Sequence, residues 1–116
     1  MSTRANIYIR ESYCDREKEI LYHHCDGYPK GVGRDLTRIL SRLPKDSEGK
    51  VQQEYLNKKR LAEFICEQDS DFKITTPCSA ADAEFEYEIN IEKRRVDWYA
   101  TSVSSRSGDE DWLCDF

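Results

Sequence analysis

The chain lacks a long hydrophobic run. No apolar stretch among its 116 residues approaches the ~20 residues that cross a bilayer. Residues 1–4 lead into a strand-like stretch and not into the apolar core of a signal peptide. These two absences predict a cytoplasmic protein that does not contact a membrane.

The chain also lacks paired cysteines. Its five cysteines are odd in number and irregularly spaced (Cys14, Cys25, Cys66, Cys78 and Cys114). A secreted disulfide framework has an even number at closer spacing, so we expect reduced thiols. No CxxC pair is present, which argues against a structural zinc ribbon or finger.

An excess of positive charge is missing as well. The formal net charge is −5, and it is unevenly distributed. Residues 1–60 carry 13 Lys and Arg against 9 Asp and Glu, whereas residues 61–116 carry 5 against 14. A general nucleic-acid binder needs a basic surface, so we expect no direct reading of DNA. The two halves are predicted to present opposite fields if they fold onto separate faces.

The length allows one hydrophobic core. Alternating apolar residues predict strands over 4–11, 19–25, 72–76, 84–92 and 95–103, and helical stripes predict helices over 33–43 and 50–68. We therefore predict a single α+β domain over 1–103, an antiparallel sheet covered on one face by two helices in the order ββααβββ, and an acidic tail over 104–116. Leu56 and Phe64 fall outside the stripe of the second helix, either as peripheral core or as a surface that meets another subunit.

The segment from Asp26 to Arg34 is dense in turn formers and immediately precedes the first predicted helix. Glycines let a backbone approach a ligand closely, and a helix N-terminus with nearby cations favours an anion. This reading requires free backbone N–H groups and predicts one set of ligand-binding residues: Asp26, Tyr28, Lys30, Gly31, Gly33, Arg34 and Arg38. The alternative is that the glycines only make a tight turn.

Four neighbouring residues are candidate metal ligands or catalytic groups: His23, His24, Cys25 and Asp26. Adjacent side chains of a strand point to opposite faces, so only His24 with Asp26, or His23 with Cys25, could converge on a metal. The same alternation separates Cys25 from His24, which argues against a catalytic dyad. We expect histidines satisfied by ordinary hydrogen bonds, and we predict no catalytic residue, no metal ligand and no cofactor.

Two rows of like charge run along predicted elements. The acidic row, on the strand over 84–92, contains Glu84, Glu86, Glu88 and Glu92. It is either a solvated face that pairs with cations such as Arg95, or a mimic of a phosphate backbone together with the acids of the tail (Asp109, Glu110, Asp111 and Asp115). The basic row, on the first helix, contains Arg34, Arg38 and Arg42. Together with Lys58, Lys59 and Arg60 of the second helix it forms the basic counterpart, which is either a solvated helix surface or a pocket between subunits that gathers the arginines around phosphates.

At residues 22–29, which read YHHCDGYP and are followed by Gly31 and Gly33, the chain resembles a group of small uncharacterised phage and prophage proteins with a Y-x-H-x-D-G-Y-P segment. Thr3 and Arg4 stand where those proteins have an N-terminal TR. The resemblance covers about the first third of the chain and implies no established activity. Where those proteins often have an aromatic residue, this sequence has Cys25. The layout is also similar to that of phage sponges that sequester cyclic ADP-ribose-type immune signals.

These observations lead to three hypotheses. The first is a non-enzymatic, phage-type anti-defence protein of the host cytoplasm, a homo-oligomer that binds a nucleotide-type small molecule or a host protein. The second is an acidic protein–protein inhibitor or nucleic-acid mimic. The third is a small metal- or thiol-dependent hydrolase around His24, Cys25 and Asp26.

Overall fold

The computed structural model describes residues 3–12, 14–75, 83–100 and 111–116. Its elements follow one another in the order β1 (Ala5–Arg10), β2 (Glu19–His23), the π-helical turn η1 (Pro29–Gly33), α1 (Arg34–Ser41), the 3₁₀ turn η2 (Gln53–Tyr55), α2 (Lys58–Gln68), β3 (Phe72–Thr75), β4 (Phe85–Asn90), β5 (Arg95–Ala100) and β6 (Asp111–Asp115). The described part of the chain is therefore α+β, as predicted.

The strands form one six-stranded sheet in the order β3-β2-β1-β4-β5-β6. Strands β1 and β4 are parallel, and the other neighbouring pairs are antiparallel. The prediction of a purely antiparallel sheet was wrong. The alternation of side chains along a strand reports which face is buried, but it contains no information about the direction of the neighbouring strand.

The predicted order ββααβββ was wrong because it omitted β6. Residues 111–115 fall in the segment that we expected to be a tail, yet they pair with β5 in a register that sets Val96 opposite Cys114. Both of these side chains are buried. Of the predicted acidic tail, residues 104–110 lie outside the described residues.

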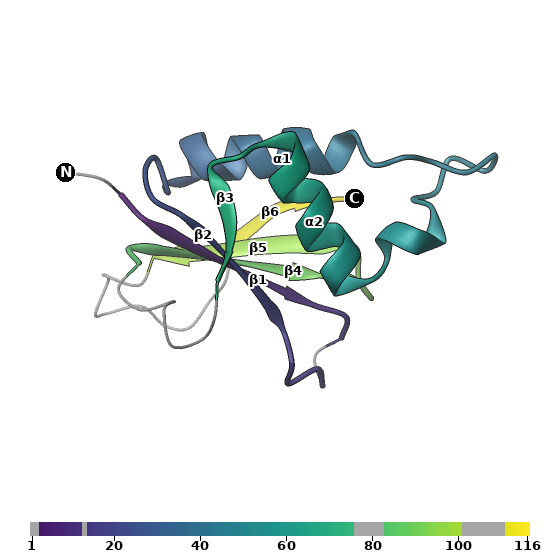
Figure 1. Cartoon of the computed structure of the whole chain (residues 1–116), viewed down its shortest axis with the longest axis horizontal. Coiled ribbons are helices and arrows are strands. Elements are labelled where there is room, and N and C mark those ends of the chain that lie inside the picture. The colour runs from purple at the N-terminus through teal and green to yellow at the C-terminus, as the bar shows by residue number, and fades with distance from the viewer. Residues whose placement is uncertain (1–2, 13, 76–82, 101–110) are drawn as a thin grey trace.

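Both α-helices cover the same face of the sheet (Figure 1). Their apolar stripes pack against alternate residues of the central strands to form one core cluster, with Leu36, Ile39 and Leu40 from α1, Leu61, Ala62 and Ile65 from α2, and Ile7, Ile9, Leu21, Tyr87 and Ile89 from the sheet. Phe64 joins this cluster at 7% exposure, and Leu56 packs against it half-buried. Both residues are therefore peripheral core in this chain.

The second helix begins later than the predicted residue 50. Val51 instead makes an isolated β-bridge with Lys45. The Asn57 side chain accepts hydrogen bonds from the backbone N–H groups of Lys59 and Arg60, and so caps α2 at its first turn. The helical stripe through Val51 was misleading because a bridge can bury the same residue.

No helix among the described residues has the length and apolar character needed to cross a membrane. The four cysteines in the described ranges are free thiols, of which Cys14 and Cys25 are exposed. The fifth cysteine, Cys78, lies outside those ranges.

Candidate functional site

The glycine corner, defined here as residues 26–34, connects β2 to α1 and is fixed to the end of the sheet. The Gly27 N–H donates to the Thr3 carbonyl at 2.8 Å, and the Tyr87 hydroxyl donates to the Gly27 carbonyl at 2.6 Å. A Cβ atom on Gly27 would lie 2.8 Å from the carbonyl carbon of Arg4. The corner therefore needs a glycine at position 27, which the sequence analysis did not single out.

The backbone N–H groups of the corner bond to the corner's own carbonyls. Those of Gly31 and Val32 donate to the Tyr28 and Asp26 oxygens at 2.9 and 2.8 Å. The Arg34 N–H is shared between the carbonyls of Pro29 and Gly31. At these three positions the free N–H groups that an anion cradle requires are not present, because the turn itself uses them.

The two glycines that were expected to face a ligand face the protein. A Cβ on Gly31 would lie 2.2 Å from the Asp26 carbonyl oxygen, and a Cβ on the buried Gly33 would lie 3.1 Å from Leu113. Close backbone approach therefore occurs here between parts of the same chain. This geometry is that of a tight turn, the alternative left open by the sequence.

The basic side chains of the corner and of α1 are exposed to solvent. Lys30, Arg34, Arg38 and Arg42 are all exposed. The Arg38 guanidinium pairs with Asp35 at 2.7 Å, whereas the other three make no ion pair with any described residue. Of the predicted anion site, the side chains of Tyr28, Lys30, Arg34 and Arg38 are therefore exposed to a ligand, and Arg42 extends this row of cations beyond the predicted set.

Tyr28 and Asp26 interact with each other. The Tyr28 hydroxyl donates to Asp26 Oδ1 at 3.1 Å, and this bond to a carboxylate raises the pKa of Tyr28. Asp26 has φ of 55°, a left-handed conformation that aspartate tolerates better than most residues. The carboxylate of Asp26 is therefore occupied in shaping the turn.

The His23 pocket, which consists of His23, Asp35 and Asp69, lies behind the glycine corner. Cross-strand pairing sets His23 opposite Ala5 and Phe72, so its ring is on the face covered by the helices. The ring is 3% exposed and stacks edge-on against Phe72 with centroids 4.7 Å apart. Neither ring nitrogen has a hydrogen-bond partner among the described residues. The expectation of a strand histidine satisfied by ordinary hydrogen bonds was wrong at this position.

Two carboxylates from the helix ends approach this ring. Asp35 lies in the first turn of α1, and Asp69 is the residue that ends α2. One donor atom from each of the three side chains lies within 4.8 Å of the other two. No sequence motif joins these residues, because they come together only when both helices pack on β2.

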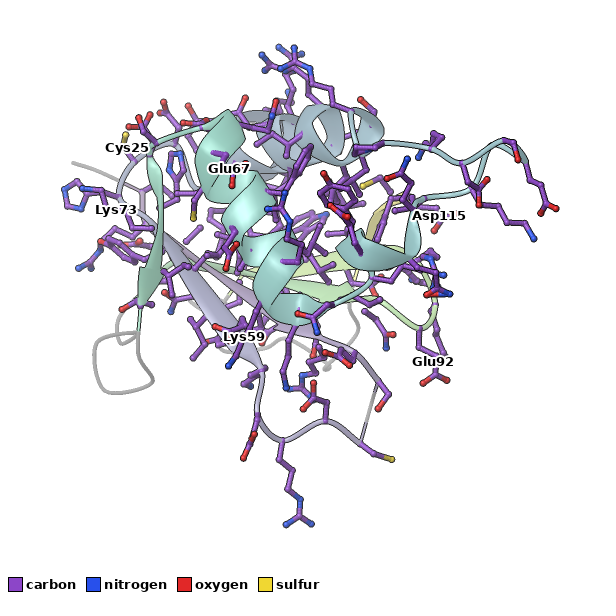
Figure 2. The ribbon with its side chains drawn as sticks, turned by 45° about the vertical axis from the view of Figure 1, so that its right-hand side comes forward. Cys25, Lys59, Glu67, Lys73, Glu92 and Asp115 are labelled. Atoms are coloured by element: carbon purple, nitrogen blue, oxygen red, sulfur yellow. The ribbon has the colours of Figure 1, made fainter. Side chains whose placement is uncertain are left out.

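The residues proposed for a thiol or metal hydrolase do not form that arrangement. His24 Nδ1 lies 3.0 Å from the Tyr22 hydroxyl, and Asp26 is engaged with Tyr28. His24 and Cys25 line a hollow of about 320 Å³ together with Tyr22, Asp71 and Lys73. Cys25 and Lys73 lie at the same side of the molecule (Figure 2). No nucleophile–base hydrogen bond joins Cys25 to His24 in the described structure.

Glu86 and Glu88 of the acidic row alternate along β4 with the buried Tyr87 and Ile89, whereas Glu84 and Glu92 lie outside the strand, and the row is partly neutralised. Glu84 pairs with Arg4 at 3.5 Å, and Glu88 pairs with Arg10 at 2.5 Å. Burial and a hydrogen bond to Glu86 raise the pKa of Tyr8. The expected partner Arg95 instead contacts Asp97 at 2.8 Å. Arg4, which immediately precedes β1, and Arg10 at its end thus pair with two of the four glutamates of the row.

Searches with this chain found no matching family model, no matching curated protein and no matching solved structure.

Proposed function

We propose that this protein is a non-enzymatic binding protein that captures a small phosphate-bearing ligand of nucleotide type at the basic row of α1. The observation that carries the proposal is the set of exposed cations Lys30, Arg34 and Arg42, which have no ion-pair partner among the described residues. Guanidinium groups bind phosphate oxygens in a bidentate manner, and their charge does not titrate near neutral pH.

Binding in this proposal depends on side chains and not on the backbone. The glycine corner positions Lys30 and Arg34, while its N–H groups at Gly31 and Val32 maintain the turn. Exposed charges separated from a ligand only by water are screened by salt. Affinity is therefore expected to fall steeply as ionic strength rises, which a cradle of backbone amides would show less strongly.

The direct test is calorimetric titration with ADP-ribose, a cyclic dinucleotide and inorganic pyrophosphate at low and at physiological ionic strength. We expect at least one of these to bind in the micromolar range. An Arg34→Ala/Arg42→Ala double variant should bind at least about tenfold more weakly, which corresponds to the loss of charge-assisted hydrogen bonds. If no probe binds better than about millimolar, the proposal is wrong.

Arg16→Ala is the matched control. Arg16 is an exposed arginine in the loop that precedes β2, at the end of that strand opposite the glycine corner. Its removal changes the net charge by the same unit as each α1 substitution. Binding should survive this change, and an equal loss would mean that the ligand responds only to overall charge.

The proposal does not require an oligomer. The sequence-based argument for one relied on Leu56 and Phe64, which pack within the chain. Size-exclusion chromatography with light scattering, in the presence and absence of the nucleotide that binds, tests oligomerisation separately.

A further inference from the structure

The imidazole of His23 is buried, yet it makes no hydrogen bond with any described residue. An imidazole ring that is 97% buried leaves both of its nitrogens without a partner among the described residues. A buried polar group without a partner costs about 1–3 kcal/mol, and native proteins rarely leave one in place without a role. The neutral ring has one nitrogen with a lone pair, which is the form that coordinates metals.

The two carboxylates of the pocket are oriented by other groups. Arg38 Nη2 donates to Asp35 Oδ1 at 2.7 Å, and the backbone N–H of Asp71 donates to Asp69 Oδ1 at 3.0 Å. Each of these bonds engages one oxygen, so the other oxygen of each carboxylate can coordinate an ion. Hydrogen bonds of this kind from outside the ligand set are what hold coordinating side chains in place.

We propose that His23, Asp35 and Asp69 bind a divalent transition-metal ion, with Zn²⁺ and Mn²⁺ as the favoured class. One imidazole nitrogen and two carboxylate oxygens suit these ions, whereas Ca²⁺ and Mg²⁺ prefer ligand sets made of oxygen alone. Two carboxylates and a neutral imidazole give the site a charge that a divalent cation balances. Two of the three ligands also have the mixed exposure that lets an ion enter, because both carboxylates are half-buried.

The spacing is close to that of a coordinated ion. Ligand distances of about 2.0–2.2 Å place the donors of a tetrahedral site roughly 3.3 Å apart. The donor atoms here lie within 4.8 Å of one another. Coordination therefore requires the two carboxylates, at the first turn of α1 and the end of α2, to rotate so that their oxygens move closer to the ring of His23.

This inference is independent of the phosphate proposal, because its ligands are not the exposed cations of the basic row. The test is isothermal titration of the metal-free protein with Zn²⁺, Mn²⁺, Mg²⁺ and Ca²⁺ separately, without nucleotide. Zn²⁺ and Mn²⁺ should bind one ion per chain and raise the melting temperature. His23→Gln and Asp69→Asn should each weaken binding by more than about tenfold, because losing even an outer-shell partner of a ligand costs about 10–100-fold.

The chain offers matched controls for both changes. His24→Gln alters the adjacent, exposed histidine, and Glu67→Gln removes an exposed carboxylate that lies two residues before Asp69 and outside the pocket. The Cys14→Ser/Cys25→Ser variant removes the two exposed thiols among the described cysteines. All three should bind Zn²⁺ as the wild type does.

A spectroscopic readout keeps the test informative if His23→Gln does not fold. Titration with Co²⁺ should give no thiolate charge-transfer band, and zinc should shift the ring signals of His23 but not those of His24 in NMR spectra. The inference is overturned if no metal binds below about 100 μM, or if binding survives in Asp69→Asn but disappears without Cys14 and Cys25.

Discussion

The glycine corner and the His23 pocket lie at the same end of β2, and they differ in how their polar groups are satisfied. In the corner, the N–H groups of Gly31, Val32 and Arg34 donate to carbonyls only a few residues away. In the pocket, the ring of His23 is buried and makes no hydrogen bond with a described residue. A glycine-rich segment can thus satisfy its backbone N–H groups with its own carbonyls, whereas the imidazole of a single histidine in a regular strand can lack a hydrogen-bond partner.

This difference shows which property marks a binding site. Residue type made the corner look like a ligand cradle, because glycines and cations gather there. The hydrogen bonds point instead to the His23 pocket, because only polar groups without a hydrogen-bond partner gain one from a ligand. The side chains of Lys30 and Arg34 retain that capacity at the corner, and the imidazole of His23 has it in the pocket.

The largest expected effect is that of adding one methyl group to the corner. Gly31→Ala places a Cβ 2.2 Å from the Asp26 oxygen, so the turn must shift, and we expect a loss of about 3 kcal/mol in the free energy of unfolding. Gly49→Ala is the matched control. Gly49 has φ of +80° and no atom within 4 Å of an added Cβ, so it should lose only about 1 kcal/mol. Urea denaturation measures both, and equal losses would show that the corner relaxes freely.

Removing the buried imidazole should not lower the free energy of unfolding, in contrast to Gly31→Ala. In the presence of a chelator, His23→Leu replaces an unsatisfied polar group with an apolar one, and the free energy of unfolding should stay constant or rise by about 1 kcal/mol. With Zn²⁺ added, the wild type should gain stability and His23→Leu should not. A loss above about 2 kcal/mol under chelating conditions would indicate that the ring has a hydrogen-bond partner in solution.

The ion pair between Lys58 and Asp15 is a polar contact in which both groups have a partner, and its contribution to stability can be compared with those of the corner and the pocket. Lys58 Nζ lies 2.9 Å from Asp15 and joins the start of α2 to the loop before β2, with both side chains about 15% exposed or less. This contact, and the N–H of Glu11, lower the pKa of Asp15 from its ordinary 3.8. Because the folded pKa is depressed, the stabilisation is complete above about pH 4 and is lost as the pH falls through the folded value.

The measurable consequence is a pH-dependent difference between the wild type and Asp15→Asn. The wild type should be the more stable protein at pH 6, and the difference in the free energy of unfolding should shrink progressively below about pH 4. Denaturant titrations at a series of pH values measure it. A difference that is constant down to pH 2 would mean that the carboxylate's charge contributes nothing.

The smallest expected effect on stability is at the basic row. Arg34→Ala and Arg42→Ala remove exposed side chains without ion pairs among the described residues, so each should change the free energy of unfolding by less than about 0.5 kcal/mol. Their effect should instead appear in phosphate binding. A larger destabilisation would show that these arginines serve the fold.

Much of the fold could be predicted because its signals are local. The alternation of Ile7 and Ile9, and of Tyr87 and Ile89, identified strands and their buried faces, which the structure confirms. The stripe of Leu36, Ile39 and Leu40 identified the buried face of α1. The late start of α2 was missed because a bridge at Val51 buries the same side as a helix would.

The candidate sites could be predicted less well, since they depend on contacts between distant segments. Lys30 and Arg34 were expected to add positive charge beside free backbone N–H groups, but they are exposed beside N–H groups that the turn itself uses. Whether the N–H groups beside them were free depended on a turn geometry that a list of glycines does not specify. Asp35 and Asp69 carry no motif with His23, so nothing in the sequence marked the pocket.

The amino-acid sequence by itself determined which residues of each strand and helix are buried, because burial follows the periods of two and 3.6 residues along the chain. Only the tertiary structure decided that β4 runs parallel to β1, that β6 completes the sheet, and that two carboxylates meet a buried imidazole. These outcomes depend on which segments pack together, and packing brings into contact residues whose separation along the chain leaves no periodic pattern.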